Sequence, residues 1–94
     1  MKQVPNGLLK LHNVGNATYK DLQLLGISCV TELAESCPDE LFIRLQAITN
    51  QTHDPCMWDI FAAAIHEART GEKLPWWKWT PVRKERQANG VFRV

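Results

Sequence analysis

Apolar residues recur at helical spacing along most of this chain, most clearly between residues 54 and 71. Asp54-Pro55 is typical of a helix start, because aspartate caps a first turn and proline fits the first helical position. Four apolar side chains then follow at i, i+3, i+4 and i+7: Trp58, Phe61, Ala62 and Ile65. Gly71 stands where a helix would end. An apolar surface this wide predicts the central, most buried helix of the fold.

Similar helix-start and helix-end residues divide the rest of the chain into short helices. Residues 36–40, Ser-Cys-Pro-Asp-Glu, predict the start of a helix that runs to about Ile48 and buries Leu41, Leu45 and Ile48. Shorter helices are expected over residues 8–11, over 17–25 with Gly26 as C-cap, and around Leu33. No segment alternates with period two for long enough to predict a strand. We therefore expect an all-α, compact bundle of about five short helices in a paired, SAM-like arrangement.

The 94 residues suffice for one domain, and the expected division is 1–81 for the helical domain and 82–94 for a basic C-terminal tail. The sequence leaves open whether that tail is helical or disordered. Trp76, Trp77 and Trp79 close the domain. Either they fold back over the central helix to seal a small core, with one ring left at the surface, or they stay exposed and stack on bases. We favour the first interpretation.

Three further features bear on compartment and partners. Residues 2–10 lack the apolar run of an export signal, and no stretch approaches the roughly 18 to 20 apolar residues of a membrane span. Cys29, Cys37 and Cys56 form no Cys-x-x-Cys motif, so we expect buried thiols, a cytoplasmic location and no membrane contact. Residues 1–71 hold five Lys/Arg and eight Asp/Glu, while residues 72–94 hold six and two. Any polyanion contact should therefore depend on backbone groups or on the C-terminal part.

Residues 11–22 resemble the helix-hairpin-helix motif, in which Gly-apolar-Gly precedes a small hydroxyl residue, an alanine and a later leucine. The turn of that motif exposes backbone N–H groups at the start of its second helix, where the helix dipole also favours an anion. A phosphate held in this way is bound without any base being read. We expect these residues to bind nucleic-acid backbone: Asn13, Val14, Gly15, Asn16, Ala17, Thr18 and Lys20.

Two departures from the pattern weaken the phosphate grip. Asn13 replaces the first glycine, which is tolerable because asparagine accepts positive φ, and the bulkier Tyr19 replaces the usual alanine. Asp21 also partly offsets the charge of Lys20. The alternative is a tight turn between helices that only packs the core. Four basic side chains could assist binding or belong to a solvated segment: Lys78, Arg83, Lys84 and Arg86.

The resemblance extends beyond the hairpin. Residues 25–34, Leu-Gly-Ile-x-x-Val-x-x-Leu-Ala, are similar to the segment that follows the hairpin in paired helix-hairpin-helix proteins. Asp-Pro-Cys at 54–56, Pro-Trp-Trp-Lys-Trp-Thr at 75–80 and Arg-Lys at 83–84 resemble the bacterial pathogenicity-locus family, whose members are often labelled mitomycin resistance or helix-hairpin-helix proteins. That resemblance, over residues 7–86, implies DNA binding connected with DNA damage. A more distant resemblance to the C-terminal domain of TfoX-like competence regulators implies a protein-binding role.

Other chemistry has weaker support in the sequence. His53, Cys56 and His66 with Cys29 and Cys37 could be imagined as a zinc site, but a second closely spaced ligand pair is missing. Cys56 could be a nucleophile at a helix N-terminus, but no oriented base is evident. No paired acids, triad or cofactor loop is present, so we expect a non-enzyme with no metal, cofactor or small-molecule substrate.

Two functions of different classes remain. The first is sequence-independent binding of DNA, duplex or single-stranded, with an affinity that falls steeply with salt. The second is a protein-interaction module with an unidentified protein partner, which the negative balance of residues 1–71 favours.

Overall fold

The computed structural model describes residues 6–90, and within them the chain forms α-helices and one 3-10 helix without any strand. The elements are α1 (Asn6–Leu9), α2 (Asn16–Leu24), α3 (Val30–Ala34), α4 (Pro38–Thr49), α5 (Cys56–Thr70), η1 (Trp76–Trp79) and α6 (Thr80–Ala88). The expected all-α bundle is therefore confirmed. It has six α-helices in this range rather than about five, because residues 80–88 add α6. The parts of the expected domain and tail at 1–5 and 91–94 lie outside the described residues.

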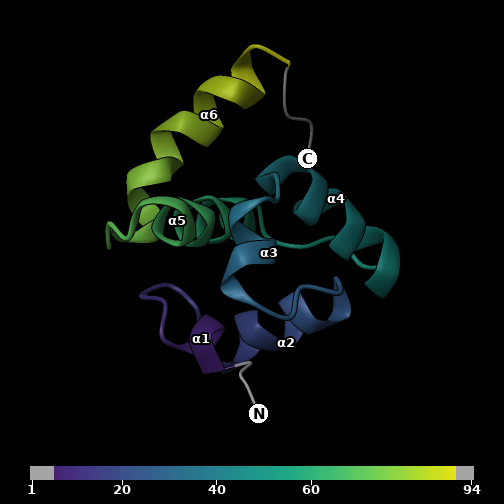
Figure 1. Ribbon diagram of the computed structural model, residues 1–94. Coiled ribbons are helices and arrows are strands. Elements are labelled where there is room, and N and C mark those ends of the chain that lie inside the picture. The colour runs from purple at the N-terminus through teal and green to yellow at the C-terminus, as the bar shows by residue number, and fades with distance from the viewer. Residues whose placement is uncertain (1–5, 91–94) are drawn as a thin grey trace.

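Helix α5 is the centre of the bundle, as the sequence predicts. Figure 1 shows it between α6 on one side and α1 and α2 on the other, with α3 and α4 alongside. The four predicted core residues are buried, and Ala63 and Ala64 are buried beside them, so α5 is covered almost all round. The Asp54 carboxylate accepts a hydrogen bond from the Cys56 amide (2.8 Å), and Gly71 ends the helix at φ 79°.

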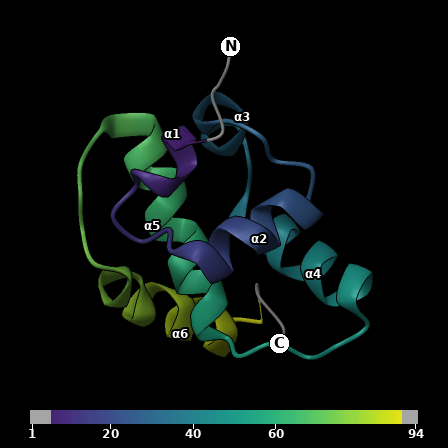
Figure 2. The ribbon, with the colours of Figure 1, turned by 90° about the horizontal axis from the view of Figure 1, so that it is seen from below.

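The remaining core comes from one face of each surrounding helix. Figure 2 shows α1, α2 and α4 grouped against α5 from below. The core side chains contributed by elements other than α5 are Leu8, Val14, Leu22, Leu25, Ile27, Leu33, Leu41, Phe42 and Leu45. The predicted burial of Ile48 is wrong, since its side chain is 49% exposed. Phe42 shifts the buried face of α4, which leaves Ile48 at the edge of that face on the last turn.

The predicted burial of the tryptophan cluster, with one ring left at the surface, is wrong for one ring, because two of the three are exposed. Trp76 and Trp77 are 37% and 56% exposed, whereas Trp79 is half-buried against the core. A 3-10 helix with a single turn presents only one side to the helix it packs against, here α5. Trp79 occupies that side, with its ring centroid 5.2 Å from that of His66 on α5.

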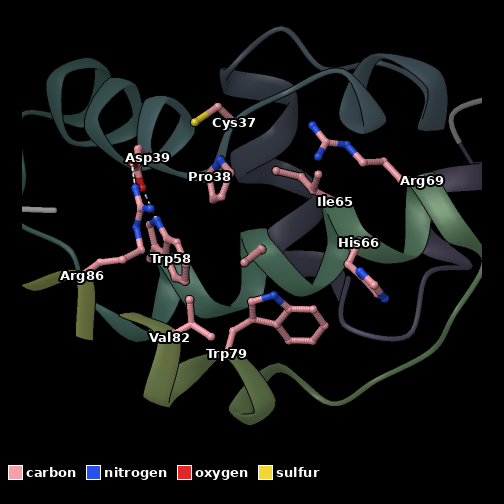
Figure 3. A pocket seen from close by; sticks show the side chains of 11 residues that line it. Cys37, Pro38, Asp39, Trp58, Ile65, His66, Arg69, Trp79, Val82 and Arg86 are labelled. Carbon is pink, nitrogen blue, oxygen red and sulfur yellow. Dashed lines mark hydrogen bonds and ion pairs between the residues drawn. The ribbon is translucent and has the colours of Figure 1, made fainter. Parts of the chain in front are cut away.

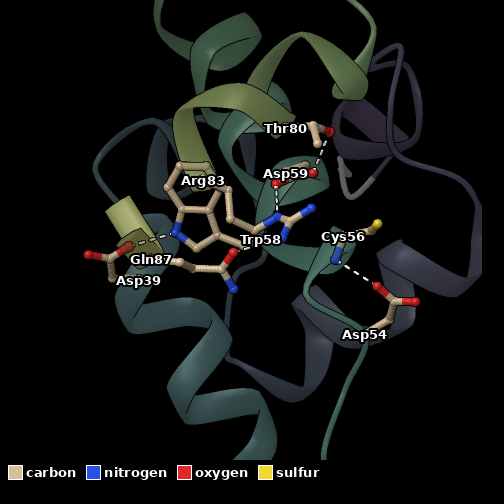
Figure 4. A network of polar contacts seen from close by, with 8 residues as sticks. All are labelled: Asp39, Asp54, Cys56, Trp58, Asp59, Thr80, Arg83 and Gln87. Atoms are coloured by element: carbon tan, nitrogen blue, oxygen red, sulfur yellow. Dashed lines mark hydrogen bonds and ion pairs between the residues drawn. The ribbon is translucent and has the colours of Figure 1, made fainter. Parts of the chain in front are cut away.

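Helix α6 is joined to α5 by a buried ion pair (Figure 4). The Asp59 carboxylate is fully buried and accepts hydrogen bonds from Arg83 Nε (2.8 Å) and Thr80 Oγ1 (2.7 Å). Arg83 also donates to Gln87 Oε1 (3.1 Å), one turn further along α6. The expected boundary between residues 81 and 82 therefore falls inside a helix that begins at Thr80, and the part of the tail up to residue 88 is helical.

The expectation of buried thiols is also wrong. Cys29 and Cys37 are exposed and Cys56 is half-buried, all three as free thiols. Cys29 and Cys37 occupy the N-cap positions of α3 and α4, where the chain enters a helix at the surface. Of the helices described, none is both long and apolar enough to cross a membrane.

Candidate nucleic-acid interface

The turn between α1 and α2 is anchored in the core by Val14. This side chain is 5% exposed and belongs to the core cluster, and its amide donates to the Leu11 carbonyl (3.1 Å). Val14 therefore holds the two short helices together, and its side chain is not available to a ligand.

Asn13 ties the turn to a distant part of the chain. Its Nδ2 donates to the Leu74 carbonyl (2.7 Å), and its Oδ1 accepts from the Trp76 amide (3.0 Å). Asn13 does not adopt the positive φ expected of a residue that replaces glycine. Within residues 6–90, the non-glycine residue with a positive φ is Asn50. The amide side chain of Asn13 instead fixes the start of η1 beside the turn.

Glu67 of α5 also holds the turn between α1 and α2 in place. Its side chain is buried, and its Oε1 accepts a hydrogen bond from the His12 amide (2.7 Å). One N–H of the turn is therefore already bonded to a carboxylate from within the protein. The sequence analysis missed this residue, because a single glutamate on a helix gives no signal of a partner 55 residues away.

The first turn of α2 is open to solvent. Gly15 is its N-cap, in extended conformation (φ −93°, ψ −172°), and no side chain among the described residues caps the helix there. Gly15, Asn16 and Ala17 are exposed, and no neighbouring atom lies within 4 Å of where a Cβ at Gly15 would stand. The amides that begin α2 are therefore accessible to an anion. Thr18, by contrast, is 8% exposed and packs inward.

Cationic side chains lie on both sides of this turn. Lys10 follows α1, Lys20 lies on α2, and both are exposed. Lys78 of η1 is exposed as well, with its Nζ 5.4 Å from the centroid of the Trp77 ring. Partial burial raises the pKa of the Asp21 carboxyl above its usual range, and the charge of His53 acts in the opposite direction.

The other predicted basic residues belong to α6, on the opposite side of α5 from the turn (Figure 1). Arg83 is buried against Asp59, and Arg86 forms an ion pair with Asp39 of α4. Lys84 is exposed on the same helix. The structure therefore places Lys20 on the helix that follows the turn and Lys78 two residues after Trp76, whose amide is bonded to the turn, and it leaves Arg83, Lys84 and Arg86 on the other side of α5.

The candidate metal ligands are dispersed. His53 Nε2 is hydrogen-bonded to Thr49 Oγ1 (2.8 Å), and His66 Nε2 lies 2.7 Å from Glu72 Oε1. In the part of the chain that the structure describes, no three His, Cys, Asp or Glu side chains gather as a metal site. A hydrogen bond with Asp54, together with partial burial and the nearby carboxylates, raises the pKa of the Cys56 thiol. This opposes the formation of a nucleophilic thiolate.

Comparisons with known proteins identify the family. The family model described as "Pathogenicity locus" matches residues 2–85. The "Mitomycin resistance protein McrB" of Streptomyces lavendulae is 35% identical over 77 residues, which cover 82% of this chain and 73% of that protein. No solved structure shows a significant match. The chain thus belongs to the pathogenicity locus family, as the motifs at residues 54–56 and 75–80 indicate.

Proposed function

We propose that this protein binds nucleic acid without sequence preference, through a helix-hairpin-helix formed by α1, the turn and α2. The observation that carries the proposal is the uncapped, exposed first turn of α2 at Gly15, Asn16 and Ala17. Backbone N–H groups at this position, aligned with the helix dipole, would hold a phosphate oxygen. The open space around Gly15 lets a phosphate approach the backbone closely.

The surrounding residues divide into two roles under this proposal. Lys10 and Lys20 attract the phosphate backbone, and the affinity should fall with salt as counterions are released. Asn13 and Glu67 are positioning residues, because they fix the turn through Leu74, Trp76 and His12 without meeting the ligand.

The exposed tryptophans favour a single strand over a duplex. Trp76 starts η1 directly beside the turn, and Trp77 follows it with Lys78 over its ring. Exposed aromatic rings next to a cationic track are typical of proteins that stack on unpaired bases. The relative from S. lavendulae is named for mitomycin resistance, and we infer from this name a role connected with DNA damage.

The test is a pair of substitutions at one residue. Gly15→Asp places a carboxylate where the phosphate would lie, and it should leave the fold intact because aspartate is a favourable N-cap. Gly15→Ala is the matched control, since its Cβ meets open space at a negative φ. We expect fluorescence anisotropy with a labelled oligothymidine at low salt to show an affinity about tenfold or more lower for Asp than for Ala, because the comparison isolates the added charge from the added Cβ.

Two outcomes would contradict the proposal. One is a folded Gly15→Asp protein that binds the oligonucleotide as tightly as the unaltered chain does. The other is the absence of any binding by the unaltered chain at low salt, where phosphate contacts are strongest.

A second candidate function is a protein-interaction module. It is favoured by three exposed apolar side chains on the adjacent helices α2 and α4, namely Leu24, Ile43 and Ile48. Large apolar side chains left exposed to solvent are available for contacts with a protein partner. Sedimentation equilibrium should then show association of the chain that Ile43→Ser weakens, with no binding of oligonucleotides.

A further inference from the structure

A cleft of about 310 Å³ lies between the start of α4, helix α5 and the η1–α6 segment. Figure 3 shows Pro38 and Asp39 on one side of it and Trp79 and Val82 on the other, with Trp58 and Ile65 of α5 between them and Arg86 joined to Asp39 at one end. No residue of the α1–α2 turn lines this cleft. Its volume is at the lower end of that of small-molecule sites, roughly 300–1,000 Å³. The cleft is therefore too small for a protein segment of any length and suits a compact ligand.

The cleft walls carry flat rings held in fixed orientations. Trp58 is 3% exposed, and its indole Nε1 donates to Asp39 Oδ1 (2.6 Å). On the other side, the Trp79 ring packs at 57° to the ring of His66. Arg86 adds a planar guanidinium 5.7 Å from the centroid of the Trp58 ring. Rings and planar groups of this kind bind flat aromatic molecules by stacking or edge contacts.

The charge of the lining residues is positive. Two guanidinium groups, on Arg69 and Arg86, line the cleft together with one carboxylate, on Asp39. That carboxylate is already paired with Arg86 and bonded to Trp58. Arg69 donates to the backbone carbonyls of Ala34 (2.6 Å) and Ser36 (3.1 Å), which are neutral and leave its charge uncompensated. An anionic substituent on the ligand would balance it.

From the shape, the rings and the charge together, we propose that this cleft binds a small, flat, fused-ring aromatic anion. The aromatic body lies against Trp79 and Val82, with the nearly buried Trp58 at the base of the cleft, and the anionic group lies toward Arg69. This site is separate from the phosphate-binding turn, and the inference does not depend on nucleic-acid binding.

The four tryptophans provide a direct test, because each indole N–H gives its own signal in a ¹⁵N–¹H correlation spectrum. The probe is naphthalene-2-sulfonate, titrated into the full ¹⁵N-labelled chain. Cyclohexanesulfonate keeps the anion without the flat ring, and 2-naphthol keeps the ring without the charge. We expect saturable shifts of the Trp58 and Trp79 signals with naphthalene-2-sulfonate and binding at least about tenfold weaker for the two controls.

A pair of variants on α6 locates the site. Val82 lines the cleft and is 45% exposed, so Val82→Phe fills the cleft without disturbing the core. Ala88→Phe adds the same ring to the exposed end of α6, outside the cleft. Val82→Phe should abolish the saturable shifts, and Ala88→Phe should leave them unchanged, with both variants showing wild-type helicity by circular dichroism.

Three results would overturn the inference. The first is equal shifts at Trp76 and Trp77, which would indicate surface stacking only. The second is unchanged binding in Val82→Phe. The third is displacement of the probe by oligothymidine, which would make the cleft part of the nucleic-acid interface. Oligothymidine that shifts Trp76 and Trp77 but leaves the bound probe in place would instead support two separate sites.

Discussion

The carboxylate of Asp59 is fully buried in α5, yet its two oxygens are bonded to Arg83 and Thr80 of α6. Removing one partner of a buried ion pair leaves an uncompensated charge, which typically costs about 3–5 kcal/mol. We expect Asp59→Ala to lower the free energy of unfolding by about this amount, a large part of the total for a small domain. Urea unfolding followed by circular dichroism measures the loss.

The matched control for this prediction is an exposed ion pair. Glu40 and Arg44 lie 3.6 Å apart on the surface of α4, with 67% and 45% of their side chains exposed. Glu40→Gln should change the free energy of unfolding by less than about 1 kcal/mol. Equal losses in the two variants would show that the Asp59–Arg83 pair is not buried as described.

The three thiols should differ in reactivity. Cys29 and Cys37 are exposed, whereas Cys56 is half-buried and its pKa is raised, mainly by its hydrogen bond with Asp54. At neutral pH we expect iodoacetamide to modify Cys29 and Cys37 before Cys56, as peptide mass spectrometry can follow. Asp54→Asn keeps a side-chain oxygen that can accept from the Cys56 amide but removes the negative charge, so it should accelerate the modification of Cys56. Modification of Cys56 first would contradict this order.

Helix α3 has only five residues, and Glu32 in its first turn binds the residue just before its N-cap, Ser28. The Glu32 carboxylate accepts hydrogen bonds from both the amide and the hydroxyl of Ser28, each at 2.7 Å, and these bonds lower the pKa of Glu32 from its usual 4.5. A carboxyl whose pKa is lowered in the folded state stabilises the fold above its unfolded pKa and loses that contribution as the pH falls through the folded value.

Glu32→Gln should therefore destabilise the protein at pH 7, and its difference from the unaltered chain should shrink as the pH falls below 4.5. Chemical denaturation of both proteins across pH 3–7 checks the sign, and NMR titration of the Glu32 carboxyl gives the pKa itself. A difference that grows on acidification would contradict the prediction.

The one-turn helix η1 separates two kinds of tryptophan. Trp77 is 56% exposed and Trp79 is half-buried against the core. We expect Trp77→Ala to change the free energy of unfolding by no more than about 0.5 kcal/mol, as for other surface positions. Trp79→Ala should cost about 1–2 kcal/mol, because it removes part of a ring from the core. Thermal and urea unfolding measure both changes. Equal destabilisation of the two variants would contradict the different burial of Trp77 and Trp79.

Much of the bundle could be predicted because its helix boundaries depend on local chemistry. Pro38, Gly26 and Gly71 mark helix ends through their own backbone preferences: α4 begins at Pro38, Gly71 is the C-cap of α5, and Gly26, at positive φ, follows the C-cap of α2, Leu25. Helix α6 could not be predicted with the same means. Its residues are mostly polar, and what packs it is the pairing of Arg83 with Asp59, 24 residues earlier. Whether the side chains of Trp77 and Ile48 are buried likewise depends on which element packs against them. The spacing of apolar residues in the sequence does not contain that information.

The candidate interface shows the same limit. The sequence indicated a turn at residues 13–18 from its resemblance to a known motif, and the structure leaves Gly15, Asn16 and Ala17 of that turn exposed. It did not indicate Glu67, nor the bond between Asn13 and the segment before Trp76. These contacts bridge 55 to 63 residues, and a single sequence carries no record of them.

The central place of α5 has a consequence for how the whole molecule opens. α5 packs against α3, α4, η1 and α6, and its buried side chains form the middle of the core, so its amides can exchange only when the bundle unfolds. α1 has four residues and packs mainly against α2, so it can detach while α5 stays covered. Native-state hydrogen exchange should therefore give α5 amides the full free energy of unfolding, and α1 the smallest value. Asp59→Ala should lower the protection of α5 by the amount measured in urea. Faster exchange in the middle of α5 than in α2 would mean that α5 is not the last helix to open.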